Sequence, residues 1–340
     1  MIKIILNYIK KFEYVSKPNS YIHQTTIDLI YDSDQNLILK YIWRFFCFLN
    51  YILAYILKNI LLIIEFIFIK KINNYKFFIN RDNNNRALIF GSASSLNDFN
   101  SNIVLKNDKT FVCNSFFLSK ISNQLKANYY TILNTSWIRR LKSYDDQNEA
   151  NLNNIFAKLG KDFSDSKFVF SKKYTKDFKS YIEKNIINYF YFNISSLSPI
   201  NYFPKIINYK TIIPHPVDVV QFNMILAYAL GFKEIYLISV EHPFESNLLE
   251  GYDKCSDTPE NINSLAAFSF KQRSKLLEQK KNLISGNLDD EELYFNHAWW
   301  HWFRGYNYYY LFQIFKKAGI NVYRHNNRGT LNFIPIKNLN

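Results

Sequence analysis

Short apolar runs separated by longer stretches of helical character recur between residues 87 and 325. Most of these runs close on a small or polar residue, as a buried strand does where it enters a loop. The runs are ALIFG (87–91), TFVCN (110–114), YYTILN (129–134), KFVFS (167–171), IINYFYF (186–192), EIYLIS (234–239) and INVYRH (320–325). Helices are predicted around 115–124, 138–158, 217–230 and 303–318. Strands that alternate with helices predict an α/β domain with a parallel sheet.

The residues that follow the first three runs are the first candidates for a binding site. Ligands of parallel sheets bind outside the carboxyl ends of the strands, so Gly91–Ser95, Asn114 and Asn134 are expected to share one crevice. Small residues let the backbone approach a ligand and offer N–H groups to a phosphate. The asparagines can both donate to and accept from a ribose or a base. Strand-end asparagines can instead cap turns, and this alternative stays open.

A long apolar segment, residues 41–72, precedes the predicted sheet. On a helical wheel Arg44, Lys58 and Glu65 fall within about 60° of one another, and the segment ends in Lys70-Lys71. A narrow polar stripe on an apolar helix is typical of helices that lie in the membrane interface near acidic head groups. The alternatives are a helix that spans the membrane, one that packs on the protein, and an oligomer contact. No signal peptide is predicted, because the apolar stretch begins late and lacks a cleavage site.

Polar stretches indicate how the chain is divided. Residues 73–86 are polar, so we predict an N-terminal part, 1–80, that carries the membrane-associating helix, and a second part, 87–340, that carries the sheet. Within the second part, residues 245–296 form a long polar insertion, which is typical of a lid over an active site. The acidic run at 289–292 indicates a solvated helix start. The aromatic stretch at 298–311 suits either stacking on sugar rings or a buried helix.

Composition narrows the classes of function. Hydrophobic residues make up 48% of the 340 residues, which excludes global disorder. The 42 basic and 28 acidic side chains give a net charge of +14, which favours an anionic partner such as acidic lipid or a phosphorylated substrate. The basic residues are dispersed and form no recognised nucleic-acid-binding module, so no nucleic acid is expected as a partner. The three cysteines lie far apart, form no metal or redox pattern and indicate a reducing compartment.

Five motifs, taken in order and spacing, resemble those of a known family. They are FGSASSL, TFVCNSFFLS, YYTILNTSW, GFKEIYL and YYLFQIFKKAGINVY. Together they are similar to the bacterial sialyltransferases of glycosyltransferase family 42, and to their surface-polysaccharide and hydroxymethylpterin-pyrophosphokinase-like relatives. The resemblance covers roughly residues 87–335. It implies a Rossmann-like sheet with helices on both faces and a small lid, and a CMP-activated sugar donor used without metal or other cofactor.

The family's nucleotide-binding residues carry over in part. Where its first loop reads Gly-Asn-Gly-Pro-Ser, Gly91 and Ser95 match, whereas Ser92 and Ser94 depart from it. Its nucleotide-contacting asparagines match Asn114 and Asn134. Its Thr-Ser-Gly at the start of the long helix is replaced here by Asp218-Val219-Val220, so His215 and Asp218 of the local motif PHPVD are the nucleotide-binding candidates at that position. The resemblance therefore implies nucleotide-sugar binding in general.

The resemblance also implies a catalytic histidine before the last helix. An ungapped count falls on Trp302, beside His301, and a neutral imidazole with a pKa of about 6.5 suits a general base. His297 is the alternative base. A metal site formed by the two histidines is not expected, because HAWWH lacks the glutamate of HExxH. Glu241 could bind a sugar hydroxyl, orient a histidine or lie in a turn, and Arg304 could offset the charge of the leaving phosphate.

These expectations together favour a membrane-peripheral glycosyltransferase. It would transfer a sugar, such as a sialic or other nonulosonic acid from a CMP-sugar, to a cell-surface glycan or glycolipid acceptor. It would act at the cytoplasmic face of the inner membrane, as a monomer or a homo-oligomer. The alternatives are a Mg²⁺-dependent pyrophosphokinase-like transferase, which needs clustered carboxylates near the strand ends, and a non-catalytic polysaccharide-assembly protein.

Overall fold

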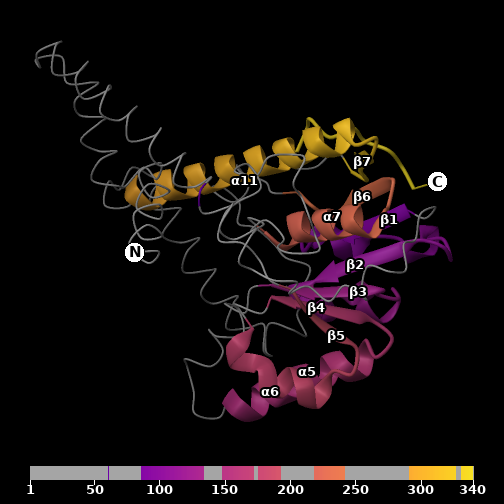
Figure 1. Ribbon diagram of the computed structural model, residues 1–340, viewed down its shortest axis with the longest axis vertical. Helices are drawn as coiled ribbons and strands as arrows, with labels where there is room; N and C mark the ends of the chain where they lie inside the picture. The colour runs from indigo at the N-terminus through magenta and orange to yellow at the C-terminus, as the bar shows by residue number, and fades with distance from the viewer. Residues whose placement is uncertain are drawn as a thin grey trace, which may run out of the picture. The chain divides into compact units, whose positions relative to one another are not determined.

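The computed structural model in Figure 1 describes residue 60 and residues 86–133, 148–171, 175–192, 218–241, 291–326 and 331–339. The chain divides into two compact units, one of residues 1–70 and 280–303 and the other of residues 71–279 and 304–340. The predicted membrane-associating helix at 41–72 lies outside the described residues apart from Ile60, which is helical. Most of the predicted lid, up to residue 290, also lies outside them. Within the described ranges, no helix is long and apolar enough to cross a membrane.

Seven parallel strands form one sheet in the order β5-β4-β3-β2-β1-β6-β7. Each apolar run of the sequence supplies one strand: β1 (Arg86–Phe90), β2 (Lys109–Cys113), β3 (Tyr129–Ile132), β4 (Lys167–Ser171), β5 (Tyr189–Phe192), β6 (Glu234–Ile238) and β7 (Asn321–Arg324). Strands such as β1 and β6 are buried on both faces along almost their whole length, which is why they read as continuous apolar runs. The predicted parallel α/β fold is confirmed.

The strand order reverses between β1 and β6. From β1 the chain adds β2 to β5 on one side and then returns to place β6 on the other side of β1. In open α/β sheets such a switch point opens a crevice at the carboxyl ends of the two strands. The backbones approach closely there: the Gly91 N–H donates to Ile238 O at 2.7 Å, and a Cβ on Gly91 would lie 2.8 Å from the Ser239 carbonyl carbon. Packing of β1 against β6 therefore requires the glycine, and its amide is used within the sheet.

The helix α7 (Val219–Leu230) covers one face of the sheet and is buried almost all round. It is mostly apolar because the sheet packs against one side and later turns of α11 (Glu291–Lys317) pack against another. Asp218 caps its start, where Oδ1 accepts from the Gln221 N–H at 2.9 Å, and left-handed Gly231 ends it. Because α7 ends just before β6 begins, its N-terminus lies at the carboxyl edge of the sheet.

The helices α5 (Asn148–Asp162) and α6 (Lys179–Asn185) cover the opposite face of the sheet (Figure 1). The helical segment predicted around 115–124 consists of two 3-10 helices, η4 (Asn114–Leu118) and η5 (Lys120–Asn123). Ser119 separates them, because its hydroxyl and its N–H both donate to Phe116 O, at 2.7 and 2.8 Å, and so end η4.

Several predicted boundaries shift in the structure. β5 begins at Tyr189 instead of 186, because the Ile186 N–H donates to Ile182 O at 2.9 Å and belongs to the end of α6. α5 extends to Asp162, and residues 138–147 of the predicted helix lie outside the described residues. α11 begins at Glu291, inside the acidic run, and not at 303; left-handed Gly319, with a φ of 71°, follows its end.

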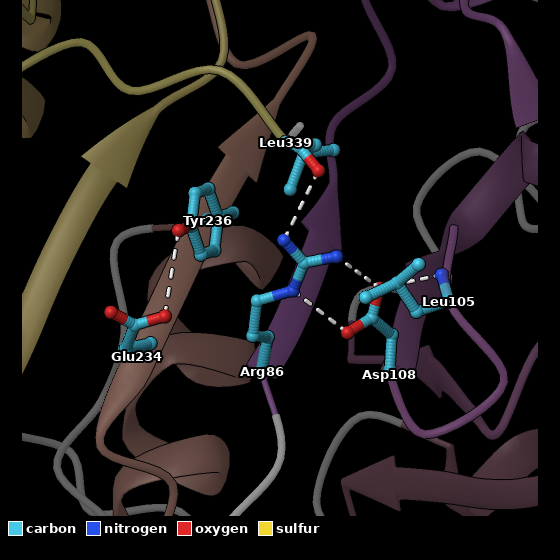
Figure 2. Close-up of polar contacts among 6 residues, drawn as sticks. All are labelled: Arg86, Leu105, Asp108, Glu234, Tyr236 and Leu339. Carbon is cyan, nitrogen blue, oxygen red and sulfur yellow. Dashed lines mark hydrogen bonds and ion pairs between the residues drawn. The ribbon is translucent and has the colours of Figure 1, made fainter. Parts of the chain in front are cut away.

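The C-terminal segment, residues 331–339, is tied to the start of β1 at the amino edge of the sheet. Arg86 donates to both carboxylate oxygens of Asp108, at 2.9 and 2.8 Å, and to Leu339 O at 3.2 Å (Figure 2). The Asp108 side chain is 3% exposed and also accepts from the Leu105 N–H at 2.8 Å. The hydrogen bond to Asp108 raises the pKa of Arg86. This arrangement joins β1, the turn before β2 and the C-terminal segment.

We expect Asp108→Asn to lower the free energy of unfolding by about 3 kcal/mol, because it leaves a largely buried guanidinium without its counter-charge. Asp165→Asn is the matched control. Asp165 pairs with Lys126 at 3.1 Å, but both side chains are more than two-thirds exposed, so the change should be within about 0.5 kcal/mol. Urea unfolding at pH 7 measures both. Equal effects of the two substitutions would contradict the role given to Asp108.

Candidate functional site

Asn114 follows β2 directly and adopts a left-handed conformation with a φ of 48°. Buried Tyr130 of β3 fixes this backbone: its hydroxyl donates to Asn114 O at 2.6 Å and accepts from the Phe117 N–H at 3.2 Å. Asn114 is the first residue of η4 (Asn114–Leu118), and its Oδ1 is buried without a hydrogen-bond partner among the described residues. A hydrogen-bond donor on a ligand would satisfy this amide oxygen.

Ser239 ends β6 on the other side of β1 and is also left-handed, with a φ of 53°. Asn114 and Ser239 are the two left-handed non-glycine residues of the described chain. Serine rarely adopts this conformation, which costs about 1–3 kcal/mol and occurs preferentially at functional sites. The Ser95 hydroxyl donates to Ser239 Oγ at 3.0 Å, so the loop after β1 is joined to the end of β6 by a pair of hydroxyl groups.

The ends of β6 and β7 place a carboxylate and an imidazole at the same edge. The His325 N–H donates to Leu237 O at 3.0 Å and extends the pairing of the two strands by one residue. Asn326 Nδ2 donates to Glu241 Oε1 at 3.4 Å. The His325 ring meets the Phe99 ring edge-on, with centroids 5.5 Å apart. Burial lowers the pKa of His325, so the imidazole is neutral at pH 7.

This pKa shift predicts how stability depends on pH. The unfolded chain binds a proton at its ordinary pKa of about 6.5, whereas the folded protein resists it. The contribution of His325 to stability is therefore complete above that pH and is lost as the pH falls. Urea unfolding of the native protein and of His325→Gln between pH 8 and pH 5 should show the difference in unfolding free energy shrinking towards acid. Parallel pH profiles would contradict the burial of the imidazole.

Asp218 and Arg304 lie beside each other at the N-terminus of α7. Asp218 Oδ1 accepts from the Gln221 N–H and, at 3.0 Å, from the hydroxyl of fully buried Tyr308. Arg304 Nε lies 3.8 Å from Asp218 Oδ2, and both side chains are about one-fifth exposed. Burial, followed by the charge of Asp218, raises the pKa of Tyr308. Asp218 therefore caps α7, ties it to α11 and holds Arg304 at the carboxyl edge.

The structure brings together part of the predicted site. Gly91, Ser95, Asn114, Asp218, Glu241 and Arg304 all lie at or beside the carboxyl edge, in the unit that contains the sheet. Ser92 lies in the same loop, half-buried. Ser94 begins the 3-10 segment η2 (Ser94–Asp98), and its side chain lies outside the description. Asn134 and His215 also lie outside the described residues. His297 and His301 lie on α11, in the other unit, and their side chains are not described.

Two residues of this edge were missed by the sequence interpretation. His325 directly follows β7, so the rule that singled out Asn114 after β2 would also have found it. Ser239 carried no such signal, since serine in a left-handed conformation is not recognisable from sequence. Among the described residues, no group of three or more His, Cys, Asp or Glu side chains could hold a metal ion.

When this chain is compared with known proteins, similar proteins are found only among solved structures. No protein-family model matches the chain, and no curated protein matches it. The sialyltransferase CstII from Campylobacter jejuni in complex with cytidine-5'-monophosphate aligns at 16% identity and a TM-score of 0.37, covering 75% of this chain and 86% of that one. CstII in complex with CMP-3FNeuAc aligns at 13% identity and a TM-score of 0.39, covering 74% and 85%. TM-scores this low do not establish a shared fold.

Proposed function

We propose that the chain is a sialyltransferase-like glycosyltransferase that uses a nucleotide-sugar donor. The observation that carries the proposal is Asn114: a left-handed residue at the end of β2, the strand next to β1, whose buried Oδ1 lacks a hydrogen-bond partner among the described residues. A buried amide oxygen without a partner is unusual in a folded protein and is explained by a ligand that donates to it. The five sequence motifs that resemble family 42 support the same class of ligand.

The proposed nucleotide site follows the carboxyl ends of β1, β2 and β3. The Asn114 and Asn134 amides would pair with the base or ribose, and the loop from Ser92 to Ser95 would face the phosphate. Arg304, held by Asp218 at 3.8 Å, would offset the charge of the leaving nucleotide. His215 would contact the nucleotide from the segment before α7.

The proposed chemistry is a displacement at the anomeric carbon of the donor. His301, or alternatively His297, takes the proton of an acceptor hydroxyl while the hydroxyl oxygen bonds to that carbon. The bond from the carbon to the phosphate oxygen breaks, and the nucleotide leaves with its electron pair. No metal or other cofactor is required. The donor would be a CMP-sugar, and the acceptor would be a cell-surface glycan or glycolipid. The segment 41–72 would bind the protein to the cytoplasmic face of the inner membrane, where the reaction would take place.

A thermal-shift screen tests the class of ligand. CMP, UDP, GDP and their sugars would be added with and without Mg²⁺, since a ligand present at 100 times its Kd stabilises a protein by about 2.7 kcal/mol. We expect CMP and a CMP-sugar to raise the melting temperature without metal. Stabilisation by ATP and Mg²⁺ alone would overturn the proposal in favour of a pyrophosphoryl transferase.

We expect Asn114→Ala to weaken nucleotide binding by about 1–3 kcal/mol, because a buried hydrogen bond to the ligand is lost. The free energy of unfolding should change much less. Asn128→Ala is the control: Asn128 Oδ1 accepts from the Thr110 N–H at 2.9 Å at the opposite edge of the sheet, so this variant should lose stability but keep its affinity. Isothermal titration with the stabilising nucleotide measures both. Undiminished affinity in Asn114→Ala would remove Asn114 from the site.

A further inference from the structure

The carboxyl ends of β6 and β7 carry polar groups that the nucleotide site does not use. Glu241 and Ser239 follow β6, and His325 and Asn326 follow β7. The hydrogen bond from the His325 N–H to Leu237 O fixes the ends of β6 and β7 relative to each other. The hydrogen bond from Asn326 Nδ2 to Glu241 Oε1 connects the residues that follow the two strands.

His325 is positioned for a contact that the described chain does not supply. Its Nδ1 is buried and has no hydrogen-bond partner among the described residues. The side chain as a whole is partly exposed, and Nε2 does not belong to its buried, unpaired atoms. Phe99 supports the ring edge-on at 5.5 Å, and Phe90 of β1 supports Phe99 at 5.3 Å, so aromatic contacts link the imidazole to the sheet. Nε2 is therefore the ring nitrogen that is open to a ligand.

The chemistry of these groups selects the kind of ligand. Glu241 offers a carboxylate, which repels a phosphate and accepts from hydroxyl groups. A neutral imidazole makes one hydrogen bond through Nε2, as donor or as acceptor according to which nitrogen holds the proton. A sugar hydroxyl both donates and accepts, so it fits either form. The Ser239 hydroxyl, which accepts from the Ser95 hydroxyl at 3.0 Å, is a further hydrogen-bonding group at this edge.

We propose that the carboxyl ends of β6 and β7 form a sugar-binding subsite in which Glu241 and His325 hydrogen-bond to hydroxyl groups of the ligand. This inference rests on the proposed function in one respect, that the sugar is the one carried by the nucleotide donor. The nucleotide would then lie over β1 to β3 and its sugar over β6 and β7, with the switch point between them.

Affinity measurements with and without the sugar test whether the nucleotide and the sugar bind at separate parts of the carboxyl edge. Isothermal titration would compare CMP with CMP-N-acetylneuraminic acid for the native protein, His325→Gln, Glu241→Gln and Asn114→Ala. We expect the His325 and Glu241 variants to bind CMP within about twofold of the native protein and the CMP-sugar about tenfold more weakly, the size of one lost hydrogen bond. Asn114→Ala should weaken both ligands alike. Equal losses for CMP and CMP-sugar in the His325 and Glu241 variants, or no loss for either, would overturn the subsite.

A direct measurement on the native protein separates this inference from the proposed function. The ¹⁵N resonances of His325, assigned by their absence in His325→Gln, would be followed as free N-acetylneuraminic acid, glucose or CMP is added at millimolar concentration. We expect a shift with at least one of the sugars and none with CMP. If no nucleotide stabilises the protein but a sugar moves the His325 signal, the donor assignment fails and the subsite stands. If CMP binds and neither the free sugars nor CMP-N-acetylneuraminic acid moves the signal, the subsite fails and the nucleotide site stands.

Discussion

Gly91→Ala is expected to lower the free energy of unfolding by roughly 3 kcal/mol, through overpacking between β1 and β6. A Cβ at this position would lie 2.8 Å from the Ser239 carbonyl carbon, closer still to its oxygen, and 3.0 Å from Val240 Cγ2. The first two obstacles are backbone atoms, which cannot turn away as a flexible side chain can. Relief requires the end of β6 to move, so Ser239 and the crevice beside it would move with it, and nucleotide affinity should fall as well.

Gly305→Ala is the control for this substitution. Gly305 lies within α11, and a Cβ there meets nothing within 4 Å. Alanine is favoured over glycine in a helix interior by about 1 kcal/mol, so this variant should be slightly more stable than the native protein. Thermal and urea unfolding of the two variants should therefore differ in sign. A Gly91→Ala protein as stable as the native one would show that the ends of β1 and β6 are not in close contact.

His301→Ala is expected to lower turnover by about 10²–10⁴-fold, the usual contribution of a general base. Affinity for the donor should barely change, because the proposed partner of the imidazole is the acceptor hydroxyl. The proposed mechanism also predicts that an acid limb in the native pH–rate profile is absent from the residual activity of the variant. Rates with saturating donor and varied acceptor measure the effect.

His297→Ala is the control, because it lies four residues earlier on the same helix. A fully active His301→Ala with an inactive His297→Ala would transfer the role of base to His297. Full activity in both variants would exclude a histidine base on α11 and make Glu241 the next candidate.

The sheet could be predicted from sequence because its strands are buried on both faces. β1 reads RALIF and β6 reads EIYLI, with all but the first residue buried, and such runs differ clearly from the polar loops around them. The type of helix around 115–124 could not be predicted, because it depends on a side chain that competes for a backbone hydrogen bond. Phe116, Phe117 and Ile121 are spaced as in a helix, but the Ser119 hydroxyl competes for the Phe116 carbonyl and leaves 3-10 turns instead.

Sequence could predict which residues of the candidate site follow a strand. It could not predict the backbone conformation of those residues. Asn114 follows a buried strand, which is enough to place it at the carboxyl edge of the sheet. Its left-handed backbone depends on Tyr130, sixteen residues later, and no local pattern reveals that contact. Gly91 was expected to let the backbone approach a ligand, and the structure shows that it also lets β1 approach the end of β6, a strand far away along the chain.

The strand order also determines when the sheet can be completed during synthesis. β1 lies between β2 and β6 in the finished sheet, but β6 begins only at Glu234, after four further strands have been made. At 5–20 residues per second the ribosome needs on the order of ten seconds to bridge that interval. Throughout it, β1 is an exposed apolar edge that could pair with another nascent chain. Protection of this edge by a chaperone would therefore matter most between the emergence of β2 and that of β6.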